Sequence, residues 1–458
     1  MTRFRYLLMG VAASALLLSC GEENKIPSGG TEQGGNGSGN EPGNKPVEDT
    51  RGPFDNEIGK PLSAWAEGCL DIHAINSGRG ECTFFIMPDG TSLCCDAGEL
   101  NMGTSEHSRV DQKPNANTRP YRVYGDYIKH FLPGNVSYLD YMLMTHFHND
   151  HFGTCTETAY NEITRSGLTW RQTGIMALYD MVPFDKMIDR AYSSNDKDYK
   201  FVAETGSSYS SGIESYANFI YWARSAKGLR VERAKNGSTT QIKLVNDAAK
   251  YPDFKVQINA VNGEYWDGRE SVDPYGTATP AENGNSISFL ISYGEFDYLT
   301  SGDAGANTKI ENNLAKSINK KIEAMKSHHH FAWDTMSATS MKIYQPKVVV
   351  SQSFYDHQPD MGHTWTCGGL SYDTKSNQAF QKAWASYGAD EDKYWFFTNI
   401  HPKTAEVYPG EVAKMRSRNG HVVIRVENGG SQFYVYVLDD TNSEYKVKQI
   451  EGPFACHK

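Results

Sequence analysis

The chain has 458 residues and a formal net charge of −10 at pH 7, with 39% hydrophobic and 12% aromatic residues. Its length suits one large domain or two ordinary ones, and its apolar content excludes wholesale disorder. The acidic balance argues against non-specific binding to nucleic-acid phosphates, although it does not exclude a local basic cleft.

The first twenty residues have the pattern of an export signal. Arg3 and Arg5 precede an apolar stretch too short to span a bilayer, and small residues lead to Cys20. The final Leu-Leu-Ser-Cys resembles a bacterial lipobox, which implies cleavage before Cys20 and acylation of its thiol. We therefore expect residues 1–19 to be a lipoprotein signal peptide, with an ordinary cleaved signal peptide as the alternative. The expected location is the outer membrane, facing the periplasm or the cell surface.

A Gly/Asn/Pro/Glu-rich segment follows. It cannot bury apolar surface, so residues 20–60 are predicted to form a flexible tether. Residues 61–458 then form the folded domain, with an insertion at about 155–280.

Strand and helix patterns alternate along this domain. Residues 68–98 contain alternating and β-rich runs around Pro-Asp-Gly-Thr, which indicates a hairpin. Helical spacing covers 118–132, and a buried strand over 139–146 ends in histidines. Within the insertion, 184–193 and 253–263 are strand-like and 212–226 is helical.

The aromatic residues of the insertion, in 216–225 and 263–271, have two interpretations. They line a substrate cleft, or they pack an inserted subdomain, which is the preferred interpretation.

The C-terminal part continues the alternation. Residues 285–305 predict a hairpin whose second strand ends at Asp303. A helix and a short strand lead to His328–His330. A buried strand at 346–353, a helix at 376–388 and a hairpin at 420–439 complete the chain. The whole pattern predicts the α/β class.

The sequence "THFHNDHFGT", residues 145–154, carries the main chemical signal. His146, His148, Asp150 and His151 fall within six positions directly after a buried strand. Imidazole and carboxylate ligands suit Zn²⁺, and also Mn²⁺ or Fe²⁺ with less selectivity. A bound ion lowers the pKa of its water toward neutrality and so creates a nucleophile. We expect a metal site here; the alternative is a set of polar surface residues at a strand end.

These residues resemble the signature of the metallo-β-lactamase superfamily of metal-dependent hydrolases. Further segments resemble the branch related to the competence protein ComEC, in family order over about residues 68–440. They are Gly78, Gly80 and Glu81 in a Gly-x-Gly-acid turn, the Pro-Asp-Gly of 88–90, the Asp-Ala-Gly of 96–98, the Ser-Gly-Asp of 301–303, the histidines of 328–330 and "YDHQPDMGHTW" of 355–365. The resemblance implies a four-layer αβ/βα sandwich.

The resemblance also implies a set of ligands. His146 and His148 would hold a first ion, Asp150 and His151 a second, and Asp303 would bridge the two. One histidine of His328–His330 would complete the second site. The family spacing favours His329, then His330, although Phe331 stands where the family has glycine.

One family ligand has no counterpart in the chain. Many members complete the first site with a histidine, but no histidine occurs between residues 152 and 327. Asn283 or Asn285 offers an amide oxygen there, unless these residues serve only in a turn. We therefore expect one or two zinc ions, with Mn²⁺ as an alternative. The same absence disfavours β-lactamase and glyoxalase II activity.

Three further residues, and Asp150 again, are candidates for supporting roles. Asp150 doubles as ligand and proton acceptor for the attacking water, and His363 donates to a leaving group or serves as an ordinary loop histidine. Asp96 is a candidate hydrogen-bond partner for a ligand histidine. Lys326 attracts an anionic substrate or is simply solvated.

The sequence therefore predicts an exported metal-dependent hydrolase that attacks an ester, preferably a phosphodiester or phosphomonoester. The substrate is expected to be a small molecule or a cell-surface ester, with nucleic acid disfavoured by charge and no protein partner inferred. The alternatives are a non-catalytic metal-containing surface binding lipoprotein, and a lactonase or β-lactamase.

Overall fold

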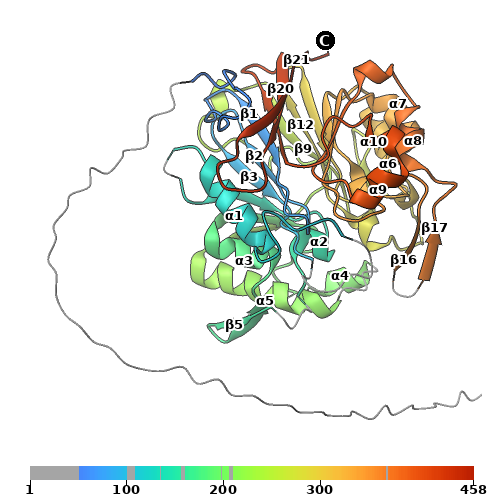
Figure 1. The fold of residues 1–458 in the computed structure, drawn as a ribbon. Helices are drawn as coiled ribbons and strands as arrows, with labels where there is room; N and C mark the ends of the chain where they lie inside the picture. The colour runs from blue at the N-terminus through green and yellow to red at the C-terminus, as the bar shows by residue number, and fades with distance from the viewer. Residues whose placement is uncertain are drawn as a thin grey trace, which may run out of the picture. The chain divides into compact units, whose positions relative to one another are not determined.

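Two large β-sheets form the framework of the protein. A computed structural model describes residues 51–100, 109–134, 136–155, 160–196, 199–205, 210–367 and 370–457. The expected signal peptide, Cys20 and the tether up to residue 50 lie outside the described residues. Figure 1 shows the two sheets beside each other, with helices on their outer sides.

The first sheet has nine strands and joins the beginning of the folded region to its end. The predicted hairpins β2–β3 and β19–β20 are antiparallel, and β1 pairs with β19 across the length of the chain. Strands β3, β4, β7 and β8 are parallel. In sheet order the strands are β21 (Val447–Ala455), β20 (Gln432–Leu438), β19 (His421–Val426), β1 (Leu70–Ala74), β2 (Thr83–Ile86), β3 (Ser92–Cys95), β4 (Leu139–Leu143), β7 (Phe184–Asp189) and β8 (Arg230–Arg233).

The second sheet has eight strands. The predicted hairpin β12–β13 is antiparallel, whereas β13, β14, β15 and β18 run parallel to one another. In sheet order they are β11 (Ser271–Val272), β10 (Glu264–Trp266), β9 (Phe254–Val261), β12 (Ser288–Tyr293), β13 (Phe296–Thr300), β14 (Ala324–Lys326), β15 (Val348–Ser351) and β18 (Tyr394–Phe397). Two small hairpins stand apart: β5 (Glu162–Arg165) with β6 (Leu168–Arg171), and β16 (Thr364–Cys367) with β17 (Leu370–Asp373).

Alternate residues along the strands divide between two faces, and this alternation builds the cores. Phe85 and Leu143 of the first sheet share one buried cluster with Phe289 and Tyr298 of the second. On the outer face of the first sheet pack α1 (Pro120–Phe131), α3 (Gly174–Met181) and α5 (Ser210–Lys227). On the outer face of the second pack α6 (Ile310–Ile318), α7 (Ala338–Tyr344) and α8 (Ala379–Trp384). The predicted α/β class is confirmed.

The remaining helices are short: α2 (Asn149–Phe152), α4 (Lys200–Glu204), α9 (Pro402–Val407) and α10 (Pro409–Val412). Within the described residues, no helix combines the length and the apolar character needed to cross a bilayer.

Helix α5 decides between the two interpretations of the first aromatic segment. Tyr216, Phe219 and Trp222 are buried and join the core against the first sheet, where Trp222 packs on Trp170 with ring centroids 5.1 Å apart. This segment therefore packs, as preferred. The second segment behaves differently, because Trp266 lines a surface hollow.

His421, at the start of β19, gives the fold a pH dependence. Its buried Nδ1 accepts a hydrogen bond from the backbone N–H of Asn76 (2.9 Å), and burial lowers its pKa to about 3. In the unfolded chain His421 binds a proton near pH 6.5, whereas in the folded protein it does so only near pH 3. The stabilisation that the neutral, buried imidazole contributes is therefore complete above pH 6.5 and is lost as the pH falls toward 3. We expect the free energy of unfolding of wild type to fall about 1.4 kcal/mol per pH unit more steeply than that of His421→Asn below pH 6. Urea unfolding of both proteins in EDTA measures this difference; parallel curves would contradict it.

Candidate metal centre

Loops at the ends of three strands bring the predicted ligands together. Residues 145–154 follow β4, Asp303 follows β13, and His328–His330 follow β14. The backbone N–H of Ile287, before β12, donates to the carbonyl of Thr145 (3.0 Å), which joins the loop after β4 to the second sheet. The N–H of His329 donates to the carbonyl of Gly302 (3.2 Å), which holds the other two loops side by side.

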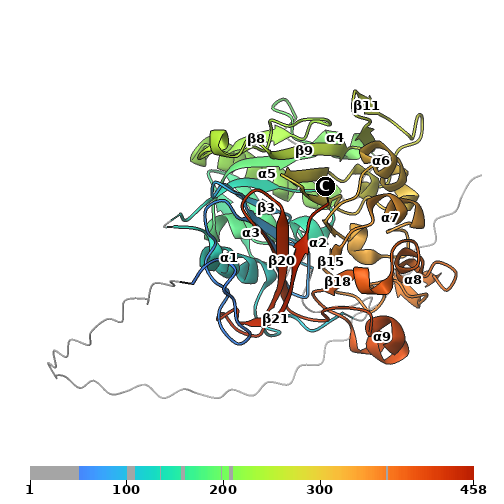
Figure 2. The same ribbon diagram turned by 90° about the horizontal axis from the view of Figure 1, so that it is seen from above.

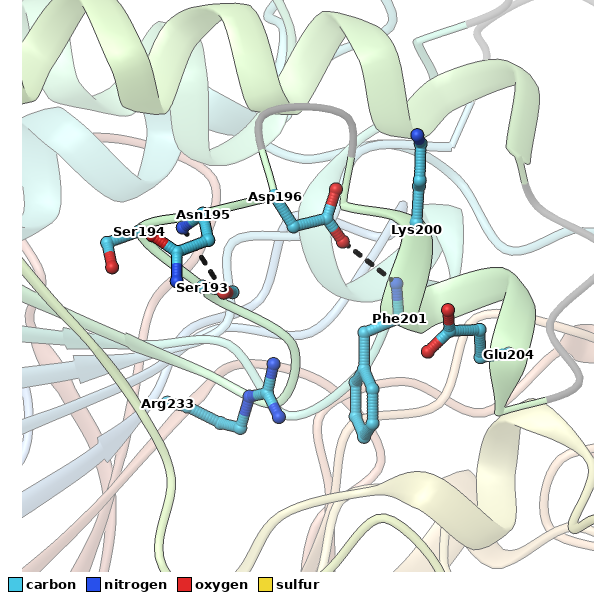
Figure 3. Close-up of a pocket in the computed structure, with 8 residues that line it drawn as sticks. All are labelled: Ser193, Ser194, Asn195, Asp196, Lys200, Phe201, Glu204 and Arg233. Atoms are coloured by element: carbon cyan, nitrogen blue, oxygen red, sulfur yellow. Dashed lines mark hydrogen bonds between the residues drawn. The ribbon is translucent and has the colours of Figure 1, made fainter.

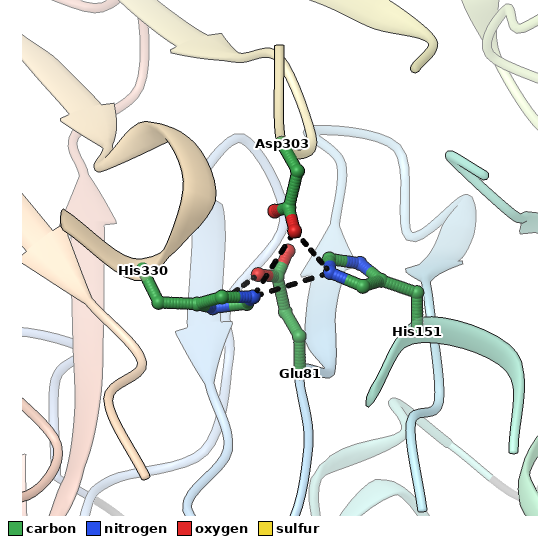
Figure 4. Close-up of side chains that lie close together, drawn as sticks. All are labelled: Glu81, His151, Asp303 and His330. Carbon is green, nitrogen blue, oxygen red and sulfur yellow. Dashed lines mark hydrogen bonds and ion pairs between the residues drawn. The ribbon is translucent and has the colours of Figure 1, made fainter. Parts of the chain in front are cut away.

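Four buried side chains form the first group of converging donors: Glu81, His151, Asp303 and His330 (Figure 4). Asp303 Oδ2 lies 3.2 Å from His151 Nε2 and 3.4 Å from His330 Nε2, and these two nitrogens are 3.2 Å apart. Only one proton fits between two facing ring nitrogens, so at least one lone pair points into the group. A divalent cation suits such a set of nitrogen and carboxylate donors.

A second group shares Asp303. Its donor atoms, from His146, His148 and Asp303, all lie within 4.8 Å of one another. His146 Nε2 is 3.7 Å from Asp303 Oδ2 and has no hydrogen-bond partner among the described residues. Burial lowers the pKa of both histidines, which favours the neutral imidazole that binds metals.

Asp150 lies at the edge of the first group. Its Oδ2 is 3.3 Å from His330 Nε2. Burial on its own would raise the pKa of this carboxyl, but the neighbouring His151 and His330 lower it, so Asp150 is ionised at neutral pH.

Hydrogen bonds on the outer side of the histidines fix their orientation. Asp96 Oδ2 lies 2.9 Å from His151 Nδ1 and also accepts from the hydroxyl of Thr145 (2.8 Å), which agrees with the role expected for Asp96. His330 Nδ1 lies 3.0 Å from the carbonyl of Gln352. These contacts leave each Nε2 facing the group, as in established metal sites.

The glycine of the Asp-Ala-Gly motif is required by close packing against the loop after β4. A Cβ on Gly98 would lie only 1.6 Å from the carbonyl oxygen of Asp150. Glycine therefore allows this backbone to pack directly against the loop that carries the ligands.

A strained turn separates the three adjacent histidines. His329, His330 and Phe331 all have left-handed backbones, with φ of 45°, 52° and 64°. Non-glycine residues in this region cost roughly 1–3 kcal/mol each, and such strain clusters at functional sites. The turn directs His328 to Glu311, with Nδ1 3.3 Å from Oε2, and His330 into the first group. The geometry therefore favours His330 over His329 as the partner of His151, because the turn aims successive side chains in different directions.

His329 instead lies beside the second group. Its Nδ1 is 2.8 Å from Asp334 Oδ1, and its Nε2 is 3.8 Å from Asp303 Oδ2 and 3.3 Å from Asn283 Nδ2. Asn285 is turned away, with its amide nitrogen donating to the carbonyl of Thr205 (3.2 Å). His329 and Asn283 thus lie together near Asp303, the carboxylate that both groups share.

The structure does not join His363 to either group. Its ring packs against Tyr408, with centroids 4.9 Å apart, and its Nδ1 accepts from the N–H of Met361 (3.4 Å). The interactions recorded for the described residues connect it with neither Asp150 nor Asp303. Its proposed role as a donor to the leaving group therefore stays a prediction.

Sequence reasoning missed the pairing of Glu81 with Lys326. Lys326 Nζ lies 2.8 Å from Glu81 Oε2 and donates to the carbonyl of Gly302 (2.9 Å). The lysine is 2% exposed, so it is not solvated. Glu81 appeared in the sequence only as part of a turn motif, and no local spacing relates it to a lysine 245 positions later.

A surface hollow of about 560 Å³ lies within the predicted insertion (Figure 3). Its basic residues are Lys200 and Arg233, and Arg233 stacks on Phe201 at 4.0 Å and donates to the carbonyls of Ala191 and Tyr192. Arg190 nearby pairs with Glu282, which accepts from the N–H of Phe147 (2.7 Å). The segment that borders this hollow therefore also supports the loop after β4.

The histidine assignments predict different losses of metal. His330→Gln is expected to lower the metal content by about one ion per chain, because it removes a donor from the first group. His328→Gln should keep the wild-type content, since His328 faces Glu311. Metal analysis of both purified proteins checks this, and equal losses in the two variants would contradict it.

No family model and no curated protein matches the chain. Among solved structures, the chain is similar to CmlA, a diiron β-hydroxylase from Streptomyces venezuelae, with 11% identity, a TM-score of 0.34 and coverage of 80% of this chain and 55% of that one. A mutant of the CmlA β-hydroxylase has 12% identity and a TM-score of 0.34, with coverage of 78% of this chain and 54% of that one. A protein of unknown function from Enterococcus faecalis has 10% identity and a TM-score of 0.26, with coverage of 56% of this chain and 49% of that one. The chain thus spans about half the length of each, and at TM-scores this low the similarities carry no argument about fold or reaction.

Proposed function

We propose that the protein is a metal-dependent hydrolase with the metallo-β-lactamase sandwich fold, in the branch related to ComEC. One observation carries the proposal: four histidine rings gather around the single carboxylate of Asp303, hydrogen bonds fix two of these rings, and Asp150 lies 3.3 Å from one of them. Zinc suits this donor set, and Mn²⁺ is the alternative.

The residues divide between two ions. Asp150, His151, Asp303 and His330 would hold one, and His146, His148 and Asp303 the other, with His329 and Asn283 beside it. When bound, such ions polarise an ester and lower the pKa of a water molecule. Asp150 is ionised and faces the group, so it is placed to accept the proton of the attacking water.

The proposed substrate is a small or headgroup-like phosphodiester or phosphomonoester. The net charge of −10 repels extended phosphate backbones and so disfavours long nucleic acids. We place the enzyme on the outer membrane through a lipid on Cys20. Cys20→Ala should move the protein from the membrane fraction to the soluble fraction, and an unchanged distribution would contradict the anchor.

Metal analysis combined with phosphodiester hydrolysis tests the activity. We expect about two ions per chain and turnover of bis-p-nitrophenyl phosphate, which Asp150→Ala abolishes. Asp180→Ala is the control, because Asp180 pairs with Arg165 on the surface. One chelator-resistant ion with no hydrolysis of any ester would instead favour a binding lipoprotein, which the three-donor second group supports. Turnover of nitrocefin or lactones, which we expect to be absent, would indicate a β-lactamase or lactonase.

A further inference from the structure

A second hollow lies on the outer face of the second sheet. It has a volume of about 360 Å³, and its walls come from β9, β10, β12 and the end of α6. Figure 2 shows β9, β11 and α6 close together at one side of the molecule. Helix α6 packs against β9 and β10, so these elements form adjoining walls of the hollow. None of the candidate metal ligands lines it.

A β-bulge aims an amide into this hollow. Ser288 pairs with Ala260, but the next residue, Phe289, pairs with Ile258, so Asn259 is an extra residue in β9. Bulges re-aim side chains and are common beside binding sites. Asn259 is 4% exposed and lines the hollow, and its Nδ2 has no hydrogen-bond partner within the described part of the chain. A buried unsatisfied donor costs about 1–3 kcal/mol, which a ligand acceptor would recover.

An aromatic ring lies beside this amide. Trp266 lines the hollow, and its carbonyl accepts from the hydroxyl of Ser317 (2.6 Å), which ties β10 to α6. Gly237 supports the ring at close range: its φ is +77°, and a Cβ there would lie 2.5 Å from the indole. The indole is therefore held as a fixed flat surface.

The remaining polar groups of the hollow are Gln257, two lysines and the hydroxyls of Ser292 and Ser317. Lys320 pairs with Asp297 at 2.7 Å. Lys255 forms no ion pair with the residues that the structure describes, so it leaves one positive charge at the rim.

We propose that this hollow binds a saccharide unit. The C–H groups of a sugar ring are apolar and slightly positive, so they pack against the electron-rich face of an indole such as that of Trp266. Sugar hydroxyls both donate and accept, which matches the amides of Asn259 and Gln257. Lys255 favours sugars that carry a carboxylate. This site is independent of the proposed hydrolase activity.

An array of neutral and uronic-acid-containing glycans, probed with the full chain, tests the site. We expect wild type to bind acidic glycans and Trp266→Ala to lose at least tenfold in binding. Asn259→Leu should lose the same binding while its melting temperature stays equal or rises, because leucine removes the unsatisfied amide. A purely structural role for Asn259 would not separate binding from stability in this way.

Trp65→Ala is the matched control, since Trp65 lines a different hollow beside His130 and Phe131. It should bind the same glycans as wild type. The proposal is overturned if wild type binds no glycan, or if Asn259→Leu binds the wild-type set undiminished. Neither outcome bears on ester hydrolysis, which is measured separately.

Discussion

Asp303→Asn is expected to empty both metal positions at once. Asp303 is the one residue common to the two donor groups, and its carboxylate faces His146, His151 and His330 at 3.2–3.7 Å. Burial on its own would raise the pKa of this carboxyl, but His151, His330 and His329 hold it well below its usual range, so the wild-type group is an anion. An amide of the same shape provides no charge to balance two cations. We expect hydrolysis to fall by more than roughly 100-fold, the upper end of what loss of an outer supporting partner costs.

Metal analysis and bis-p-nitrophenyl phosphate hydrolysis measure this effect, with circular dichroism to show that the fold persists. Asp180→Asn is the control, because its partner Arg165 is also on the surface. A variant that kept the wild-type metal content would contradict the shared role of Asp303.

Lys326→Met is expected to cause the largest loss of stability. The substitution would leave the fully buried Glu81 without its cationic partner at 2.8 Å. Breaking a buried ion pair by removing one member typically costs about 3–5 kcal/mol, because the other charge stays buried. Urea unfolding in EDTA measures this loss in the free energy of unfolding without a contribution from bound metal.

The double variant Glu81→Gln/Lys326→Met separates charge from packing. If the uncompensated carboxylate causes the loss, removing its charge should recover much of the stability. A single variant within about 1 kcal/mol of wild type would show that Glu81 does not depend on this lysine.

Local patterns were sufficient to predict most of the secondary structure. The apolar run before the histidines forms β4, and the spacing of 118–132 produces α1. The turn residues of 88–91 lie in an antiparallel hairpin, as expected from their chemistry, and the hairpin predicted over 420–439 is also antiparallel. Contacts between distant segments were not predictable in this way. The pairing of β1 with β19 and of Glu81 with Lys326 depends on tertiary packing, which has no local periodicity.

For the candidate site too, some features could be predicted from the sequence and others depended on the folded backbone. The resemblance indicated His146, His148, Asp150, His151 and Asp303 as ligands. The structure gathers the three histidines around the Asp303 carboxylate and places Asp150 beside His330. The choice among His328–His330 depended on backbone conformation, because three successive left-handed residues change the direction of each ring. The spacing of residues along the sequence does not reveal a left-handed turn when the turn contains no glycine.

Phe331 stands where the family that the chain resembles has glycine, and its packing links the site to a distant part of the core. Its left-handed backbone costs roughly 1–2 kcal/mol. Its ring is fully buried against Phe380, Trp395 and Phe397, and burying a phenylalanine contributes about 1.5–3 kcal/mol, which offsets that cost. The direction of His330 is therefore coupled to the packing beneath the second sheet. Substitutions deep in this core, far from any donor atom, would change the affinity for metal by changing how firmly the turn is held.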